Sequence, residues 1–320
     1  MVIVLIDLIF SLFLLTLGLL ALLIGTYPDL KVREVPDWVS YGLIISGLAI
    51  RLAAAIVAGA TAGTGSMGWL AAGKLFGIDL LWFLAFVLIA YLMFYSGQWG
   101  GGDAKLLMGL GIVFATYPRS LFTLAPQLSP DLAIPFPITL ILHIFIFGAV
   151  YGLLLSLYLA LKQWGLFLQK WREIRVKERK LWFLAQLLFV FGLVAAIVSF
   201  ILDYDLFVFF AIFVAFLPYI FLVLWIFART VEQVCMIHNI SVPKLREGDW
   251  IVKDVYYKNS SSKKTYICGP KDLGISNEQI ALLKKYKIHS VLVKEGIPFV
   301  PAFLLATIIS LIWGNLFVLF

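Results

Sequence analysis

The chain has 320 residues, of which 62% are hydrophobic and 13% charged, and its mean hydropathy is +1.01. A soluble protein carries about 25% charged residues, so this composition excludes a soluble globular enzyme and indicates a multi-pass membrane protein. The formal net charge of +7 suggests nucleic acid as a partner. Positively charged loops on one face of a membrane explain the charge more simply, and no nucleic-acid partner is expected.

The chain contains eight apolar segments that are expected to cross the membrane. A helical span needs about 20 apolar residues, and the first segment is too long and too uniformly apolar for a signal peptide. The shorter segment 104–117 must also cross if the loops are to alternate in side, and residues 67–78 are expected to form a helix at the surface. The expected spans are 2–26, 38–58, 79–96, 104–117, 136–161, 181–202, 206–228 and 297–320.

The charges in the loops predict the orientation of the chain. Lysine and arginine concentrate in loops 27–37 and 162–180 and in the long segment 229–296, whereas the alternate loops carry few charges. Because positively charged loops face the cytoplasm, this set is expected to be cytoplasmic and both chain ends to face outward. Loops 27–37 and 97–103 then lie on the same, cytoplasmic face.

Residues 229–296 differ in character from the rest, because charges become frequent there. A strand-like run at 250–257, a turn at 259–264, a helix at 276–287 and a short strand at 289–293 predict a small α+β domain. The expected fold is therefore an all-α polytopic membrane protein with a small cytoplasmic α+β domain. The expected domains are a transmembrane domain at 1–228, the cytoplasmic domain at 229–296 and a C-terminal span at 297–320.

Two aspartates lie at the membrane edges of the cytoplasmic face. Asp29 follows the first span, and Asp103 lies in the run Gly-Gly-Gly-Asp-Ala-Lys that begins at Gly100. Carboxylates at such positions are costly and usually functional. Two carboxyl groups within reach share one proton, so one can activate water while the other polarises a peptide carbonyl. The pair titrates as a unit, and neither role is assigned to either residue.

The residues around Asp103 suit a role in supporting such a site. Gly100 and Gly102 let the backbone pass close to a substrate and permit positive φ. Asp103 is expected to begin a helix, where the N-terminal dipole favours a negative charge. Lys105 is expected near the interface or near the carboxylates.

Ordinary structural roles remain open for these and other polar residues. Asp103 could be a helix N-cap, and Asp29 in Tyr-Pro-Asp-Leu could be a turn residue. Asp37 is expected to be the N-cap of the second span and His143 to be interfacial. Arg51 could snorkel to the interface, pair with an anion or serve function.

The sequence predicts no metal site and no cofactor. The two cysteines, Cys235 and Cys268, form no Cys-x-x-Cys motif, so a thiolate zinc site is not expected. His238 and His289 lie in the expected α+β domain without ligand-like neighbours.

Two local patterns together resemble a known family. Residues 29–37 read DLKVREVPD and residues 100–107 read GGGDAKLL. This arrangement resembles the type IV prepilin peptidases, membrane aspartic proteases with a Gly-x-Gly-Asp motif, and in particular the archaeal preflagellin (prearchaellin) and prepilin peptidases. The resemblance covers residues 20–116 and implies a six-helix peptidase core. Residues 294–301 (KEGIPFVP) also look like the end of longer archaeal members, which carry a cytoplasmic domain before a last span.

The resemblance implies that Asp29 and Asp103 are the catalytic residues of an aspartic endopeptidase, with Gly100, Gly102 and Lys105 in support. The implied substrate is a prepilin or preflagellin precursor whose short basic leader precedes a hydrophobic helix. Cleavage would occur without a cofactor at the cytoplasmic face of the plasma membrane. The paired Cys-x-x-Cys motifs of bacterial members that also methylate the new N-terminus are absent, so cleavage without methylation is expected. The oligomeric state is left open.

Two other functions compete with this interpretation. Presenilin-like and signal-peptide-peptidase-like intramembrane proteases also use Gly-x-Gly-Asp, but their first aspartate follows a tyrosine in a preceding span. Here Tyr204 and Asp205 come after the motif, and Pro301-Ala302-Phe303 only partly resembles the downstream Pro-Ala-Leu. A non-enzymatic transporter or filament-assembly scaffold would explain the additional spans but leaves the paired aspartates unexplained.

Overall fold

The computed structural model describes residues 2–62, 66–118, 134–258 and 264–314. The chain forms two compact units, one made of residues 1–153 and 296–320 and the other of residues 154–295. Within the described ranges, six helices are long and apolar enough to cross a membrane. Together with a small strand-containing region, they confirm the expected class, a helical multi-pass membrane protein with an α+β part.

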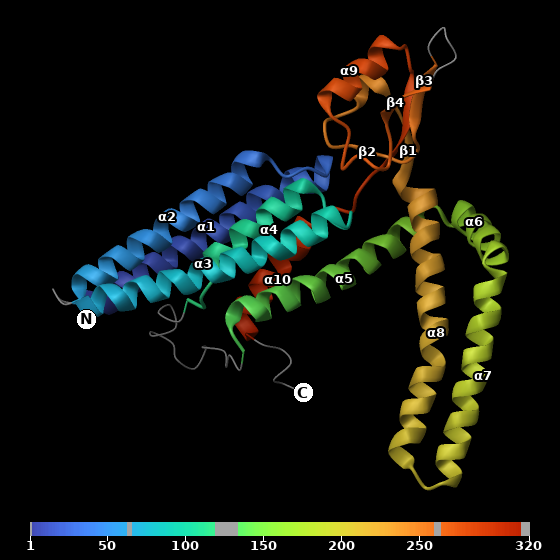
Figure 1. Ribbon diagram of the computed structural model, residues 1–320, viewed down its shortest axis with the longest axis horizontal. Coiled ribbons are helices and arrows are strands. Elements are labelled where there is room, and N and C mark those ends of the chain that lie inside the picture. Colours follow the sequence, from blue (N-terminus) through green and yellow to red (C-terminus); the bar gives the residue numbers. More distant parts are fainter. Residues whose placement is uncertain (1, 63–65, 119–133, 259–263, 315–320) are drawn as a thin grey trace. The chain divides into compact units, whose positions relative to one another are not determined.

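The first unit is a bundle built around α4. Its helices are α1 (Val2–Val32), α2 (Asp37–Thr61), α3 (Ser66–Tyr95), α4 (Gly101–Val113), the first part of α5 (Phe136–Lys162) and α10 (Val300–Trp313). Helix α4 packs against α1, α2 and α3 (Figure 1). All residues from Gly109 to Val113 are buried, as expected for a helix that is apolar on every side.

The observed helices differ from the expected segments at two spans and at the expected surface helix. The spans 104–117 and 297–320 correspond to α4 with 13 residues and α10 with 14, both shorter than the roughly 20 residues of a full crossing. The prediction of a separate surface helix at 67–78 was wrong, because these residues are continuous with α3. No proline interrupts this segment, and Lys74 alone does not end a helix.

The second unit contains a helical hairpin. Helix α6 (Trp164–Lys177) occupies most of the expected basic loop 162–180, and α7 (Arg179–Ile201) and α8 (Asp205–Val231) pack side by side. The Phe189 ring lies edge-on to the rings of Phe216 and Tyr219, at 5.1 and 5.4 Å between centroids. These contacts join the two helices within the hairpin.

The α+β part of the second unit follows α8 through a π-helical turn, Glu232–Met236. Strands β1 (Ile237–Ser241), β5 (Ser290–Lys294) and β2 (Trp250–Ile251) form an antiparallel sheet in that order. Strands β3 (Val255–Lys258) and β4 (Lys264–Cys268) form a hairpin, and a short 3-10 helix covers Val242–Lys244. The strand-like run 250–257 is thus divided between two sheets. Most of the expected turn at 259–264 lies outside the described residues.

The expected helix at 276–287 is α9 (Asn277–Lys285). Ser276 is its N-cap, and its hydroxyl accepts a hydrogen bond from the Gln279 backbone N–H at 3.3 Å. The Gln279 side chain in turn accepts from the Ser276 N–H at 2.9 Å. This reciprocal pair is a capping box, and it fixes the start of the helix.

Candidate active site

Asp29 lies in the last turn of α1 and is not a turn residue. Its side chain is buried, with the residue 3% exposed, and its Oδ2 accepts a hydrogen bond from the backbone N–H of Val300 at 2.8 Å. Val300 is the first residue of α10, so its N–H has no partner within its own helix. The Asp29 carboxylate therefore supplies this partner and lies where the helix dipole favours a negative charge.

Asp103 lies in the first turn of α4 and is the third helical residue, whereas Gly100 is the N-cap. The Gly100 backbone N–H donates to Asp103 Oδ2 at 3.3 Å. Helices α1 and α4, which carry Asp29 and Asp103, pack against each other, although the two residues are 74 positions apart. The structure therefore brings the two aspartates together in one region of the first unit.

Of the three glycines before Asp103, Gly102 is needed for close packing, and none of the three has an unusual backbone conformation. Gly100 has φ −69°, and in the described turn between α3 and α4 the positive φ belongs to Gly97, at 71°. The expectation of positive φ at Gly100 and Gly102 was wrong. A Cβ atom on Gly102 would lie 3.0 Å from Val35 Cβ and 3.2 Å from Val35 N, so only glycine lets α4 begin this close to the segment that follows α1.

Lys105 joins the first turn of α4 to the first turn of α2. Its Nζ lies 2.6 Å from Asp37 Oδ1 and 5.0 Å from the centroid of the Tyr41 ring. Asp37 is the first residue of α2 and not its N-cap, which is Pro36. Lys105 therefore forms its ion pair with Asp37. It affects Asp103 indirectly, by fixing the start of α4.

Sequence reasoning missed several residues that surround the aspartates. Trp99 is buried immediately before Gly100, and its ring centroid lies 5.3 Å from those of Phe299 and Phe303. The Arg33 guanidinium donates a hydrogen bond to the Gly296 carbonyl. In the sequence, residues 294–301 show only a resemblance to the end of longer archaeal members. Their contact with α1 depends on long-range packing that no local pattern reveals.

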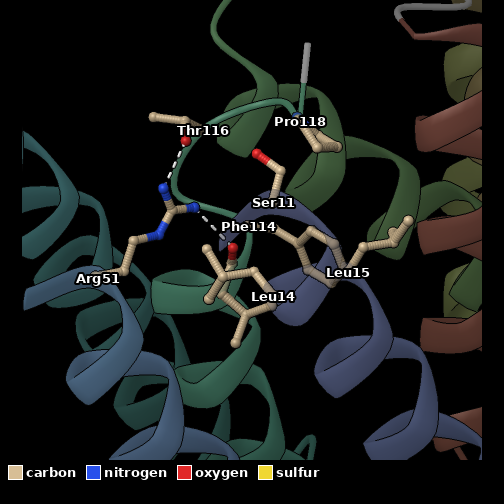
Figure 2. A pocket seen from close by; sticks show the side chains of 8 residues that line it. Ser11, Leu14, Leu15, Arg51, Phe114, Thr116 and Pro118 are labelled. Atoms are coloured by element: carbon tan, nitrogen blue, oxygen red, sulfur yellow. Dashed lines mark hydrogen bonds between the residues drawn. The ribbon is translucent and has the colours of Figure 1, made fainter. Parts of the chain in front are cut away.

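Arg51 lies at the other end of α4, beside a small pocket (Figure 2). Its guanidinium donates to the carbonyl oxygens of Ile112 at 3.1 Å and Val113 at 2.8 Å, and to Thr116 Oγ1 at 2.7 Å. Arg51 therefore does not snorkel, because it bonds the carbonyl groups that end α4. The pocket is lined by Ser11, Leu14, Leu15, Arg51, Val113, Phe114, Thr116 and Pro118.

His143 is a packing residue in the first unit. It is buried, and its Nδ1 lies 2.8 Å from Ser310 Oγ of α10, so the expectation of an interfacial histidine was wrong. Within the described ranges, no group of three or more His, Cys, Asp or Glu side chains is arranged to hold a metal ion.

The segment that carries both aspartates matches a known family. Residues 16–157 match the Type IV leader peptidase family. This part of the chain is similar to that family. The matched segment begins within α1, contains α2, α3 and α4, and ends within α5. It therefore includes Asp29 in the last turn of α1 and Asp103 in the first turn of α4.

Two proteins that are similar to this segment are named preflagellin peptidase. The protein from Methanocaldococcus jannaschii is 28% identical over 142 residues, which cover 44% of this chain and 55% of the relative. The protein from Methanococcus voltae is 29% identical over 147 residues, which cover 46% of this chain and 56% of the relative. The chain therefore spans little more than half the length of these relatives. No solved structure matches the chain.

Proposed function

We propose that the protein is an aspartic endopeptidase that removes the leader peptide from prepilin-like or preflagellin-like membrane precursors. The observation that carries this proposal is the position of Asp29 in the last turn of α1 and Asp103 in the first turn of α4, two helices that pack against each other. Both residues lie within the segment that matches the leader peptidase family. The names of the two relatives support a preflagellin-type substrate.

The proposed reaction is hydrolysis by the two carboxyl groups without a covalent intermediate. One carboxylate takes a proton from a water molecule while the water oxygen attacks the peptide carbonyl carbon. The other carboxyl group donates a proton to the carbonyl oxygen. The tetrahedral intermediate then collapses, the C–N bond breaks and the departing amine takes up a proton. Each acid or base role contributes about 10²–10⁴-fold to the rate.

The neighbouring residues have supporting roles in this proposal. Gly100 ends the turn before α4 and donates its N–H to Asp103, and Gly102 permits the close approach of α4 to Val35. Lys105 holds the start of α4 against Asp37. All three act on the position of Asp103, and none is assigned a bond-making step.

The proposed substrate carries a short basic leader followed by an apolar helix, and cleavage occurs on the cytoplasmic face of the plasma membrane. The concentration of lysine and arginine in loops 27–37, 162–180 and 229–296 supports this orientation. An apolar substrate helix would lie in the bilayer while the peptide bond before it reaches the membrane edge. The positions of Asp29 in the last turn of α1 and Asp103 in the first turn of α4 support cleavage at such an edge.

The decisive experiment is cleavage of a co-expressed prepilin-like precursor in membranes by wild type, Asp29→Asn and Asp103→Asn. Each variant keeps the shape of the side chain but cannot exchange protons as a carboxyl group does. We expect each to lose at least about a hundredfold in cleavage rate at normal membrane levels of the protein.

The matched control is Asp205→Asn, at the first residue of α8. We expect this variant to cleave at the wild-type rate. If Asp205→Asn were inactive while Asp29→Asn remained active, a presenilin-like arrangement would replace the proposal. A wild-type protein that cleaves none of several such precursors would favour a transporter or assembly scaffold.

A further inference from the structure

We infer that the segment Gly296–Val300, at the start of α10, is a positioning element that holds the end of α1, which carries Asp29, against the start of α4, which carries Asp103. The importance of this positioning for catalysis rests on the proposed function. Its structural content is separate from that function, because one short segment contacts both aspartate-bearing elements. These contacts lie entirely within the first unit.

The segment is attached to the end of α1 at two points. Val300 N–H donates to Asp29 Oδ2 at 2.8 Å. Four residues after Asp29, the Arg33 guanidinium donates to the Gly296 carbonyl. Backbone donors to a charged acceptor are among the stronger protein hydrogen bonds, so the carboxylate cannot move without the segment.

The same segment is attached to the residue that precedes the Gly-Gly-Gly-Asp run. The Phe299 ring packs on Trp99 with 5.3 Å between centroids, and Phe303, one turn further along, lies 5.3 Å from both rings. Trp99 is 6% exposed and is joined directly to the N-cap of α4, Gly100. A displacement of Phe299 would therefore reach the Asp103 helix through this aromatic cluster.

Gly148 of α5 closes the other side of the Phe299 ring. A Cβ atom on Gly148 would overlap this ring, which has little room to move because Trp99 and Phe303 hold it. Gly152 lies one helical turn further along α5, and a Cβ atom there meets nothing within 4 Å. Alanine at Gly148 therefore displaces the Phe299 ring, whereas alanine at Gly152 is a control with no such contact. Neither substitution changes a catalytic group.

Hydrogen exchange tests the attachment without any assay of activity. Pro298 and Pro301 have no N–H, so Phe299 and Val300 are the exchanging amides between them. We expect Asp29→Ala to accelerate exchange of the Val300 amide by about tenfold or more, through loss of its acceptor. Asp103→Ala should leave this amide within about twofold of wild type. Unchanged exchange in Asp29→Ala would overturn the inference even if the protein proves to be a peptidase.

Steady-state kinetics test whether the attachment matters for catalysis. Gly148→Ala should lower kcat for leader cleavage by about tenfold or more while KM stays within about twofold, because small misplacements of reacting groups reduce the rate steeply. Gly152→Ala carries the same substitution on the same helix and should remain within about twofold of wild type in both constants. Equal kcat in the two variants would contradict the positioning role.

The two tests separate failure of the inference from failure of the proposed function. If wild type cleaves no leader, the kinetic comparison has no signal, but the exchange experiment still decides whether Asp29 holds the segment. If wild type cleaves and Asp29→Asn is inactive, normal kcat in Gly148→Ala rejects the positioning role alone.

Discussion

Gly102 packs directly against Val35, and a Cβ atom at Gly102 would lie 3.0 Å from Val35 Cβ and 3.2 Å from Val35 N. Gly102→Ala must therefore push α4 and the segment after α1 apart by a few tenths of an ångström. Because α4 carries Asp103 and the other segment directly follows the last turn of α1, which carries Asp29, we expect the rate of leader cleavage to fall about tenfold. The rate is measured in membranes at matched protein levels.

The control for this prediction is Gly101→Ala. A Cβ atom on Gly101 would lie 3.7 Å from Phe94 Cε2, an ordinary van der Waals contact. Alanine is also a better helix former than glycine. Gly101→Ala should therefore cleave within about twofold of wild type, and a loss as large as that of Gly102→Ala would show that the Val35 contact is not the cause.

Lys105 is expected to have a smaller effect than either aspartate. Its partner Asp37 is largely exposed, and partly exposed ion pairs contribute about 0–1 kcal/mol to stability. Lys105→Met should lower the cleavage rate only a few-fold, and Lys105→Arg should preserve it. A hundredfold loss in Lys105→Met at normal membrane levels would instead place Lys105 against the substrate or the reacting groups.

The sequence predicted most of the helices because a bilayer requires long apolar segments, which hydropathy detects directly. The loop charges also predicted that Asp29 and Asp103 share one membrane face, which stays a prediction. The expected surface helix at 67–78 contains the charged residue Lys74. In the structure, residues from Ser66 to Tyr95 form one continuous helix.

The rest of the candidate site depends on contacts between distant residues. Val300 lies 271 positions from its acceptor Asp29, and neither residue type predicts such a pair. The role of Arg51 was equally hidden, because its partners are backbone carbonyl groups at the end of α4. Every helix end has unpaired carbonyl groups. The packing of α2 against α4 determines that Arg51 bonds those of α4.

Cys268 provides a test of the α+β region. Burial, and secondarily the nearby Asp272 carboxylate, raise the pKa of the Cys268 thiol to about 11. The thiolate is the reactive form, and a pKa above that of a free thiol leaves only about one molecule in a thousand ionised at pH 8. In a Cys235→Ala variant, where Cys268 is the remaining cysteine, we expect maleimide labelling of the folded protein to be at least about a hundredfold slower than that of the denatured protein.

The pH dependence of this labelling has a definite sign. Because the pKa is raised, the labelling rate of the folded protein should keep increasing from pH 8 toward pH 11, whereas an exposed thiol levels off above about pH 9. Rapid labelling at pH 8 with a plateau near pH 9 would show that Cys268 is exposed and unperturbed.

Arg51 is expected to stabilise the bundle without taking part in the reaction. Its Nη1 lies 3.7 Å from Asp79 Oδ1 of α3, and both side chains are 11% exposed. Arg51→Met leaves this carboxylate buried without its cation and removes donors from the last carbonyl groups of α4. Breaking such a pair from one side costs about 3–5 kcal/mol. We expect a loss of this order in the free energy of unfolding, measured in mixed micelles with increasing SDS.

A double-mutant cycle separates the two contributions of Arg51. Asp79→Asn removes only the carboxylate charge, so Arg51→Met with Asp79→Asn should be less destabilised than the sum of the single variants if the ion pair matters. A coupling near zero would assign the effect to the hydrogen bonds with Ile112, Val113 and Thr116. Because Asp103 lies in the first turn of the same helix, about 15 Å along its axis from Val113, cleavage per folded molecule should stay near the wild-type value. A fall in kcat at equal folded protein would connect this end of α4 to the reaction.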